Sequence, residues 1–71
     1  MFDYSKLRGR ITEFFGTIEK FSEKLGATPT TVGRKLLGKS GWTQDEIINS
    51  CKLLSISANE IHTYFFTQKV E

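Results

Sequence analysis

The chain has 71 residues, of which 38% are hydrophobic and 25% charged, and its formal net charge is +2. This length predicts one small domain over residues 1–71, which buries only about 60% of the surface that its unfolded form exposes. Cys51 is the only cysteine, so an internal disulfide is excluded, and Cys51 and His62 supply too few ligands for a zinc site. No apolar run approaches the roughly 20 residues of a membrane span, and the N-terminus lacks a signal-peptide pattern. We therefore expect a cytoplasmic protein without a metal, a cofactor or a membrane partner.

The charge is unevenly distributed along the chain. Residues 1–40 carry eight basic and four acidic side chains, a net charge of +4, whereas residues 41–71 carry two basic and four acidic ones, a net charge of −2. The first part is suited to a polyanion. Ordinary solvated helix faces explain the same distribution, so charge alone leaves the choice open.

The first 26 residues predict two helices. Asp3 is placed to cap the first and Gly16 to end it, whereas Thr17 caps the second and Gly26 ends it. Their apolar side chains recur at the spacing of one helix face: Tyr4, Leu7, Ile11, Phe14 and Phe15 in the first helix, and Ile18, Phe21 and Leu25, with the small Ser22, in the second.

Thr28-Pro29 is the clearest local signal, because a hydroxyl cap followed by proline at the first helical position favours a helix start. The third helix is predicted over about 29–37, and Gly33 weakens it by about 1 kcal/mol relative to alanine. Residues 38–41 form a loop. The side chains expected to face inward are Val32 and Leu36, with Leu37 left open.

Two capping boxes predict the last helices. Thr43 with Glu46 begins a fourth, and Ser57 with Glu60 begins a short fifth. Residues 66–70 form either a short strand or an extended tail. The fourth helix is expected to turn Ile47, Ile48, Cys51 and Leu54 inward, and Trp42 is expected to cover the core. The chain is therefore predicted to be all-α, with five helices.

The segment between the second and third helices carries a motif, Ile18-x-x-Phe21-Ser22-x-x-Leu25-Gly26-Ala27-Thr28-x-x-x-Val32. It resembles the helix-turn-helix of the lambda-repressor and Cro type (Xre-like), as in small regulators of bacteriophages and prophages of Gram-positive bacteria. The resemblance implies a compact five-helix lambda-repressor-like domain, with the motif at about 17–37 and the recognition helix at about 29–37. It also implies that the protein acts in the cytoplasm of a bacterial or phage-infected host cell.

The chain departs from this family at two places. Ile18 stands where many relatives have a glutamine that contacts a phosphate. Lys35 stands where an apolar inward residue is usual, and Leu36 follows it. The second departure predicts a slightly rotated recognition helix.

The resemblance also implies a set of DNA contacts. Arg34 is the strongest candidate for a base contact, because its guanidinium matches the two acceptors of guanine; a solvated arginine or a phosphate contact is its alternative. The implied base contacts are Pro29, Thr30, Thr31 and Arg34, and the implied phosphate contacts are Thr17, Thr28, Lys35, Lys39, Ser40 and Arg10.

These features predict a sequence-specific, double-stranded DNA-binding transcriptional regulator, a Cro-like repressor that binds as a homodimer and occludes a promoter. The alternative is an antirepressor or modulator of the same fold that binds a second regulator protein instead of DNA. An enzyme is not expected, because the sequence offers no phosphate loop, catalytic triad or metal cluster.

Overall fold

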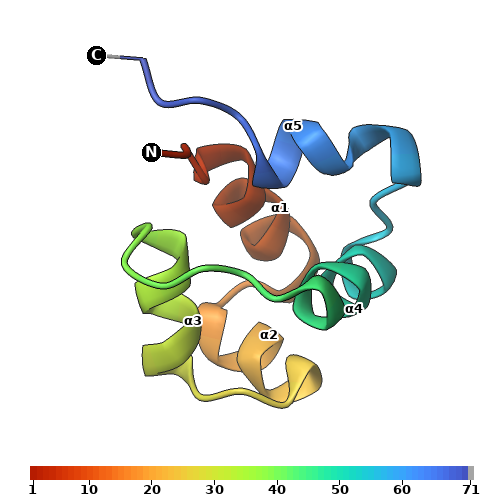
Figure 1. The fold of residues 1–71 in the computed structure, drawn as a ribbon. Coiled ribbons are helices and arrows are strands. Elements are labelled where there is room, and N and C mark those ends of the chain that lie inside the picture. The colour runs from red at the N-terminus through yellow and green to blue at the C-terminus, as the bar shows by residue number, and fades with distance from the viewer. Residues whose placement is uncertain (71) are drawn as a thin grey trace.

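The computed structural model describes residues 1–70 and contains the five predicted α-helices. They are α1 (Ser5–Phe15), α2 (Ile18–Leu25), α3 (Pro29–Leu36), α4 (Gln44–Leu54) and α5 (Ile61–Phe65), with a 3₁₀ turn at Ala58–Glu60 leading into α5. Helices α2 and α3 lie at one end of the molecule, α5 lies at the other with the chain ends, and α1 lies between them (Figure 1). No helix within residues 1–70 has the length and apolarity needed to cross a bilayer.

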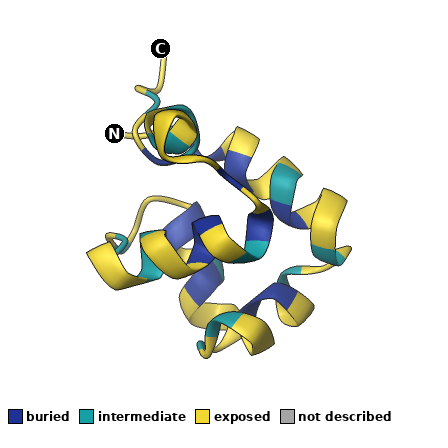
Figure 2. Ribbon diagram, turned by 90° about the vertical axis from the view of Figure 1, so that its right-hand side faces the viewer, coloured by how far each residue is buried: buried dark blue, intermediate teal, exposed yellow. Residues whose placement is uncertain are grey.

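Every helix contributes to one apolar core (Figure 2). Each large side chain removed from water there contributes about 1.5–3 kcal/mol. Cys51 is buried among these residues, and burial raises the pKa of its thiol, which confirms the prediction of a small buried hydrophobe. The side chains least exposed to solvent are Leu7, Ile11, Phe21, Val32, Leu54 and Phe65.

The helix starts follow the predicted caps with one exception. The Thr28 hydroxyl accepts a hydrogen bond from the Thr31 amide, and both capping boxes are present. Asp3 does not cap α1 as predicted, because Tyr4 occupies the N-cap position. The Asp3 carboxylate instead accepts bonds from the amide and hydroxyl of Ser5, and the Ser5 bonds hold the pKa of Asp3 below its ordinary value.

Gly26 makes the tight turn between α2 and α3. Its φ of +85° lies in the left-handed region, where glycine carries no steric penalty, and its amide bonds the Ser22 carbonyl. Ala27 and Thr28 complete the connection. The connection between α2 and α3 is therefore only three residues long.

Two apolar side chains, Phe14 and Ile48, lie farther out than expected, and Leu37, whose direction the sequence left open, is exposed as well. Phe14 is exposed, and the Arg10 guanidinium lies over its ring, 4.5 Å from the ring centroid. Ile48 is exposed, since Ser50, Cys51 and Leu54 form the buried face of α4. Leu37 is 59% exposed beyond the end of α3.

Trp42 and the chain ends cover the core beside Tyr4 and α5. Trp42 is half-buried and packs on Tyr4 and Phe65, with ring centroids 6.2 and 5.3 Å apart, as predicted for a side chain that covers the core. Of the two alternatives for residues 66–70, the structure has the extended tail, in which Gln68 makes an isolated antiparallel bridge with Phe2.

Lys35 is the one buried cation among the described residues. Its ammonium donates to the Gly41 carbonyl at 2.8 Å and pairs with the Glu46 carboxylate at 3.0 Å. Burial alone would raise the pKa of Glu46, but the Thr43 amide and Lys35 outweigh it, so this pKa is lowered from its ordinary 4.5. The contacts join α3, the loop after it and the start of α4.

Neutralising Glu46 should therefore weaken the fold. We expect Glu46→Gln to lower the free energy of unfolding by about 1–2 kcal/mol at pH 7, since it leaves the Lys35 charge poorly compensated. Because the pKa of Glu46 is lowered in the folded chain, this contribution is present above pH 4.5 and disappears as the pH falls through the folded-state pKa. Urea unfolding between pH 7 and pH 3 measures the difference.

Asp45→Asn is the matched control, because it removes the same charge from the adjacent, exposed position in the first turn of α4. It should cost at most about 0.5 kcal/mol, the usual size of a helix-dipole effect. Equal costs for the two variants, or a Glu46→Gln deficit that persists at pH 3, would contradict this role of Lys35 and Glu46.

Candidate functional site

The exposed face of α3 carries the side chains that the sequence predicted as base contacts. Pro29, Thr30, Thr31 and Arg34 are all exposed there. Thr30 and Arg34 lie one helical turn apart, and Leu37 follows on the same side, so that the row ends in an aliphatic side chain. We call this row, with the caps and the loop described next, the α2–α3 surface.

The caps at this surface are partly occupied within the protein. The Thr28 hydroxyl accepts from the Thr31 amide and bonds the Thr31 hydroxyl at 2.9 Å. The Thr17 hydroxyl accepts from the Lys20 amide at 3.2 Å and keeps its own proton for an outside acceptor. Thr17 therefore remains able to donate to a phosphate or a carbonyl, whereas Thr28 serves mainly to start α3.

The loop after α3 adds one cation to the surface. Gly38 adopts φ +79°, and the Lys39 amide then bonds the Arg34 carbonyl at 2.9 Å. This bond folds the loop back on the helix end. Lys39 is exposed and Ser40 is half-buried, so the loop holds a polar pair beside Arg34.

Two predicted phosphate contacts are turned into the protein instead. Arg10 donates from Nε to the Leu54 carbonyl at 2.9 Å and from Nη2 to the Ser55 carbonyl at 3.2 Å, at the end of α4. Cations favour this end of a helix, where carbonyls lack partners. Lys35 is held by Gly41 and Glu46. The phosphate roles expected of Arg10 and Lys35 are therefore not supported by this geometry. Among the predicted DNA contacts, the cations that remain exposed are Arg34 and Lys39.

The structure shows how α3 accommodates a lysine at an inward position. Lys35 stays on the buried side with Val32 and Leu36, because its aliphatic stem packs in the core and its charge is compensated at the tip. The pair Leu36-Leu37 contained a signal that sequence reasoning did not use. Val32, Lys35 and Leu36 form one buried face. At about 100° per residue, Leu37 lies roughly 150° from the centre of that face and therefore points outward.

The chain is similar to a protein family and to a solved structure. The model of the family described as a protein of unknown function (DUF739) matches residues 1–68. No curated protein matches the chain in sequence. A solved structure, the modulator of repression of the temperate bacteriophage TP901-1 from Lactococcus lactis, superposes with a TM-score of 0.81 and 40% identity. The match covers 99% of this chain and 95% of that one.

These matches overturn two expectations. The assignment to the lambda-repressor and Cro type family is wrong, because the matching family is DUF739. The expectation of a Cro-like repressor is also wrong, since the solved relative is a modulator of repression, which favours the alternative of a regulator-binding protein. The motif misled because its glycine and apolar positions are demanded by packing of the helix pair, whatever the outer face binds.

The inward position of Arg10 has a measurable consequence. We expect Arg10→Ala to lower the free energy of unfolding by about 1.5–3 kcal/mol, since it removes two charge-assisted bonds to carbonyls at the end of α4. In a domain of this size that corresponds to a fall of roughly 6–24 °C in melting temperature, which is followed by circular dichroism. Arg8→Ala, on the exposed side of the same helix, should change stability by less than about 0.5 kcal/mol. A melting temperature unchanged by Arg10→Ala would contradict the assignment.

Proposed function

The chain belongs to DUF739, a protein family of unknown function, and we propose that it acts as a phage modulator of repression. It binds a DNA-binding repressor protein and changes how that repressor acts at its operator. The observation that carries the proposal is the likeness to the modulator of phage TP901-1, at 40% identity over 99% of the chain. The proposal involves no catalytic step, and it places the chain in the cytoplasm of a bacterium that carries the phage.

The surface chemistry supports a protein partner. With Arg10 and Lys35 directed inward, the α2–α3 surface has fewer cations than the sequence predicted. The row on α3 ends at Leu37, which is 59% exposed. An exposed leucine contributes little to phosphate contacts and much to a protein interface, where apolar side chains leave water together.

A second candidate function is supported by the first part of the same row. Thr30, Thr31 and Arg34 are exposed on the outer side of α3, opposite the residues that it buries. We propose that they contact DNA only in a joint complex, after the repressor has brought this chain to the duplex. Arg34 is then the residue that reads a base or clamps a phosphate.

Binding to a repressor is directly testable. The purified chain is titrated calorimetrically into each helix-turn-helix repressor encoded by the phage or prophage that carries it, and each complex is sized by light scattering. We expect one repressor to bind with a dissociation constant of about 1 μM or tighter. The same light-scattering run shows whether the chain alone forms the predicted homodimer. The proposal would be refuted if none of these repressors formed a complex with the chain even at protein concentrations about 100-fold above this dissociation constant.

Arg34→Ala separates the two candidates. If DNA is contacted only in the joint complex, this variant should bind the repressor unchanged but weaken the joint complex on operator DNA by about tenfold, measured by gel shift. Lys24→Ala serves as a control cation on α2. An operator affinity equal to that of the unaltered chain would leave repressor binding as the only function.

A further inference from the structure

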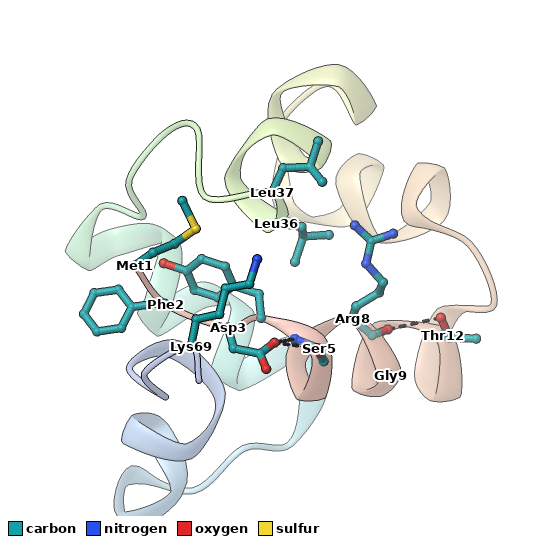
Figure 3. Close-up of a pocket in the computed structure, with 11 residues that line it drawn as sticks. Met1, Phe2, Asp3, Ser5, Arg8, Gly9, Thr12, Leu36, Leu37 and Lys69 are labelled. Carbon is teal, nitrogen blue, oxygen red and sulfur yellow. Dashed lines mark hydrogen bonds between the residues drawn. The ribbon is translucent and has the colours of Figure 1, made fainter. Parts of the chain in front are cut away.

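A groove lies beside the end of α3, outside the row of predicted DNA contacts. It is formed by the chain ends, by one side of α1 and by the last residues of α3, and it encloses about 530 Å³ (Figure 3). That volume is within the range of sites that hold several side chains or a small molecule.

The groove has an apolar part built by the end of α3 and the N-terminal segment. Leu36 closes its base, whereas Leu37 and Met1 stand at its edge with 59% and 75% of their surfaces exposed. The edge at Met1 is held in place, because its carbonyl accepts from the Lys69 amide at 2.9 Å and the Asp3 amide donates to the Thr67 carbonyl at 2.7 Å. The exposed Met1 side chain is thus held at the edge of the groove by hydrogen-bonded backbone, and the chain ends here are paired with each other.

The groove also has a basic part. Arg8 from α1 and Lys69 from the C-terminal segment line it, and both extend toward the end of α3 on either side of Leu36 (Figure 3). Asp3, the carboxylate that lines the groove within residues 1–70, is bonded by Ser5, and Lys69 further lowers the pKa of Asp3. Arg8 makes no ion pair with the described residues. In this part of the chain, the charged side chains of the lining are Arg8, Lys69 and Asp3, which together carry a net charge of +1.

We propose that this groove is the docking site for an acidic, apolar segment of the partner repressor. The segment presents a large aliphatic or aromatic side chain, which packs on Leu36 and Leu37, and an adjacent carboxylate, which Arg8 binds. The inference rests on the proposed function for the identity of the partner, and it adds the surface used and the chemistry recognised.

The combination of the two parts selects this occupant. A phosphate backbone would use the cations but would leave Leu37 and Met1 beside a hydrated chain, whereas a purely apolar segment would leave Arg8 without a partner. Arginine suits a carboxylate, because its guanidinium can donate two parallel bonds. Burial of the leucine beside this ion pair excludes water and strengthens it.

Four single substitutions, arranged as two matched pairs, test the groove against the repressor identified above. Arg8→Glu is compared with Lys6→Glu, which makes the same charge change two residues earlier on α1, outside the groove. Leu37→Ala is compared with Ile48→Ala, since Ile48 is an exposed aliphatic residue on α4. All four positions are exposed, so the variants should fold, as circular dichroism checks.

Calorimetric titrations with the repressor should separate the pairs. We expect Arg8→Glu and Leu37→Ala each to weaken binding by about tenfold or more, and both controls to stay within about twofold. Loss of binding with Arg8→Glu but not with Leu37→Ala, together with weaker binding of duplex DNA, would identify a phosphate site and overturn the proposal. The proposal would also be overturned if Arg8→Glu and Leu37→Ala weakened repressor binding no more than their respective controls, Lys6→Glu and Ile48→Ala.

A peptide selection tests the recognised chemistry without the repressor. Random 12-residue peptides displayed on phage are selected on the immobilised chain and then depleted on the Arg8→Glu variant. An enriched pattern with Asp or Glu beside Leu, Ile, Phe or Met supports the proposal, and basic patterns, or peptides that bind the variant equally, overturn it. If peptides of the expected pattern are enriched but no repressor binds, the groove stands and the proposed function fails.

The mass of the chain in solution shows whether a second copy of this chain, and not the repressor, occupies the groove. Light scattering of the chain alone should give the same mass for the unaltered chain and for Arg8→Glu. A dimer that separates on Arg8→Glu substitution would show that the groove binds another copy of this chain, which would overturn the assignment to the repressor.

Discussion

The orientation of α3 depends on a single buried cation. Lys35 packs its stem beside Val32 and Leu36, and its ammonium reaches both the Gly41 carbonyl and the Glu46 carboxylate. An unpaired charge at this depth would cost several kcal/mol, so the helix is stable only in the rotation that satisfies it. That rotation keeps Thr30 and Arg34 in solvent. The same contact holds the loop from Gly38 to Gly41. The Gly41 carbonyl at the end of this loop accepts a hydrogen bond from Lys35 of α3, and α4 begins three residues later, at Gln44.

The fixed rotation also divides the two leucines at the end of α3. Leu36 enters the core and closes the base of the groove, whereas Leu37 stands at its edge in water. The helix therefore presents a polar row at its start and an apolar residue at its end, beside the cation of Arg8. These are two different chemistries, and one partner need not satisfy both. A protein that docks at the apolar end leaves Thr30 and Arg34 uncovered, which is why repressor binding and a later contact with DNA are compatible on one small domain.

Local signals predicted most of the fold, because caps and turns are decided within a few residues. Thr28-Pro29 and the two capping boxes began helices where expected. Contacts between distant segments were not predictable in the same way. The carbonyls that hold Arg10 lie 44 and 45 residues away, so its inward direction has no signature in the sequence around it. Asp3 failed as a cap because its bond to Ser5 starts the helix one residue later than assumed.

The partner was the least predictable feature, for a physical reason. The positions that carry the helix-turn-helix pattern, Phe21, Gly26 and Val32, are either buried or conformationally constrained, and they meet the demands of packing two short helices through a tight turn. The positions that choose a partner lie on the opposite side of those helices, where packing imposes nothing. A modulator and a repressor can therefore share every constrained residue and differ only where the sequence is unconstrained. This chain is distinguished by three features of its surface. The side chains of Arg10 and Lys35 are turned away from it, Leu37 is exposed on it, and a groove with cationic and apolar parts lies beside Leu37.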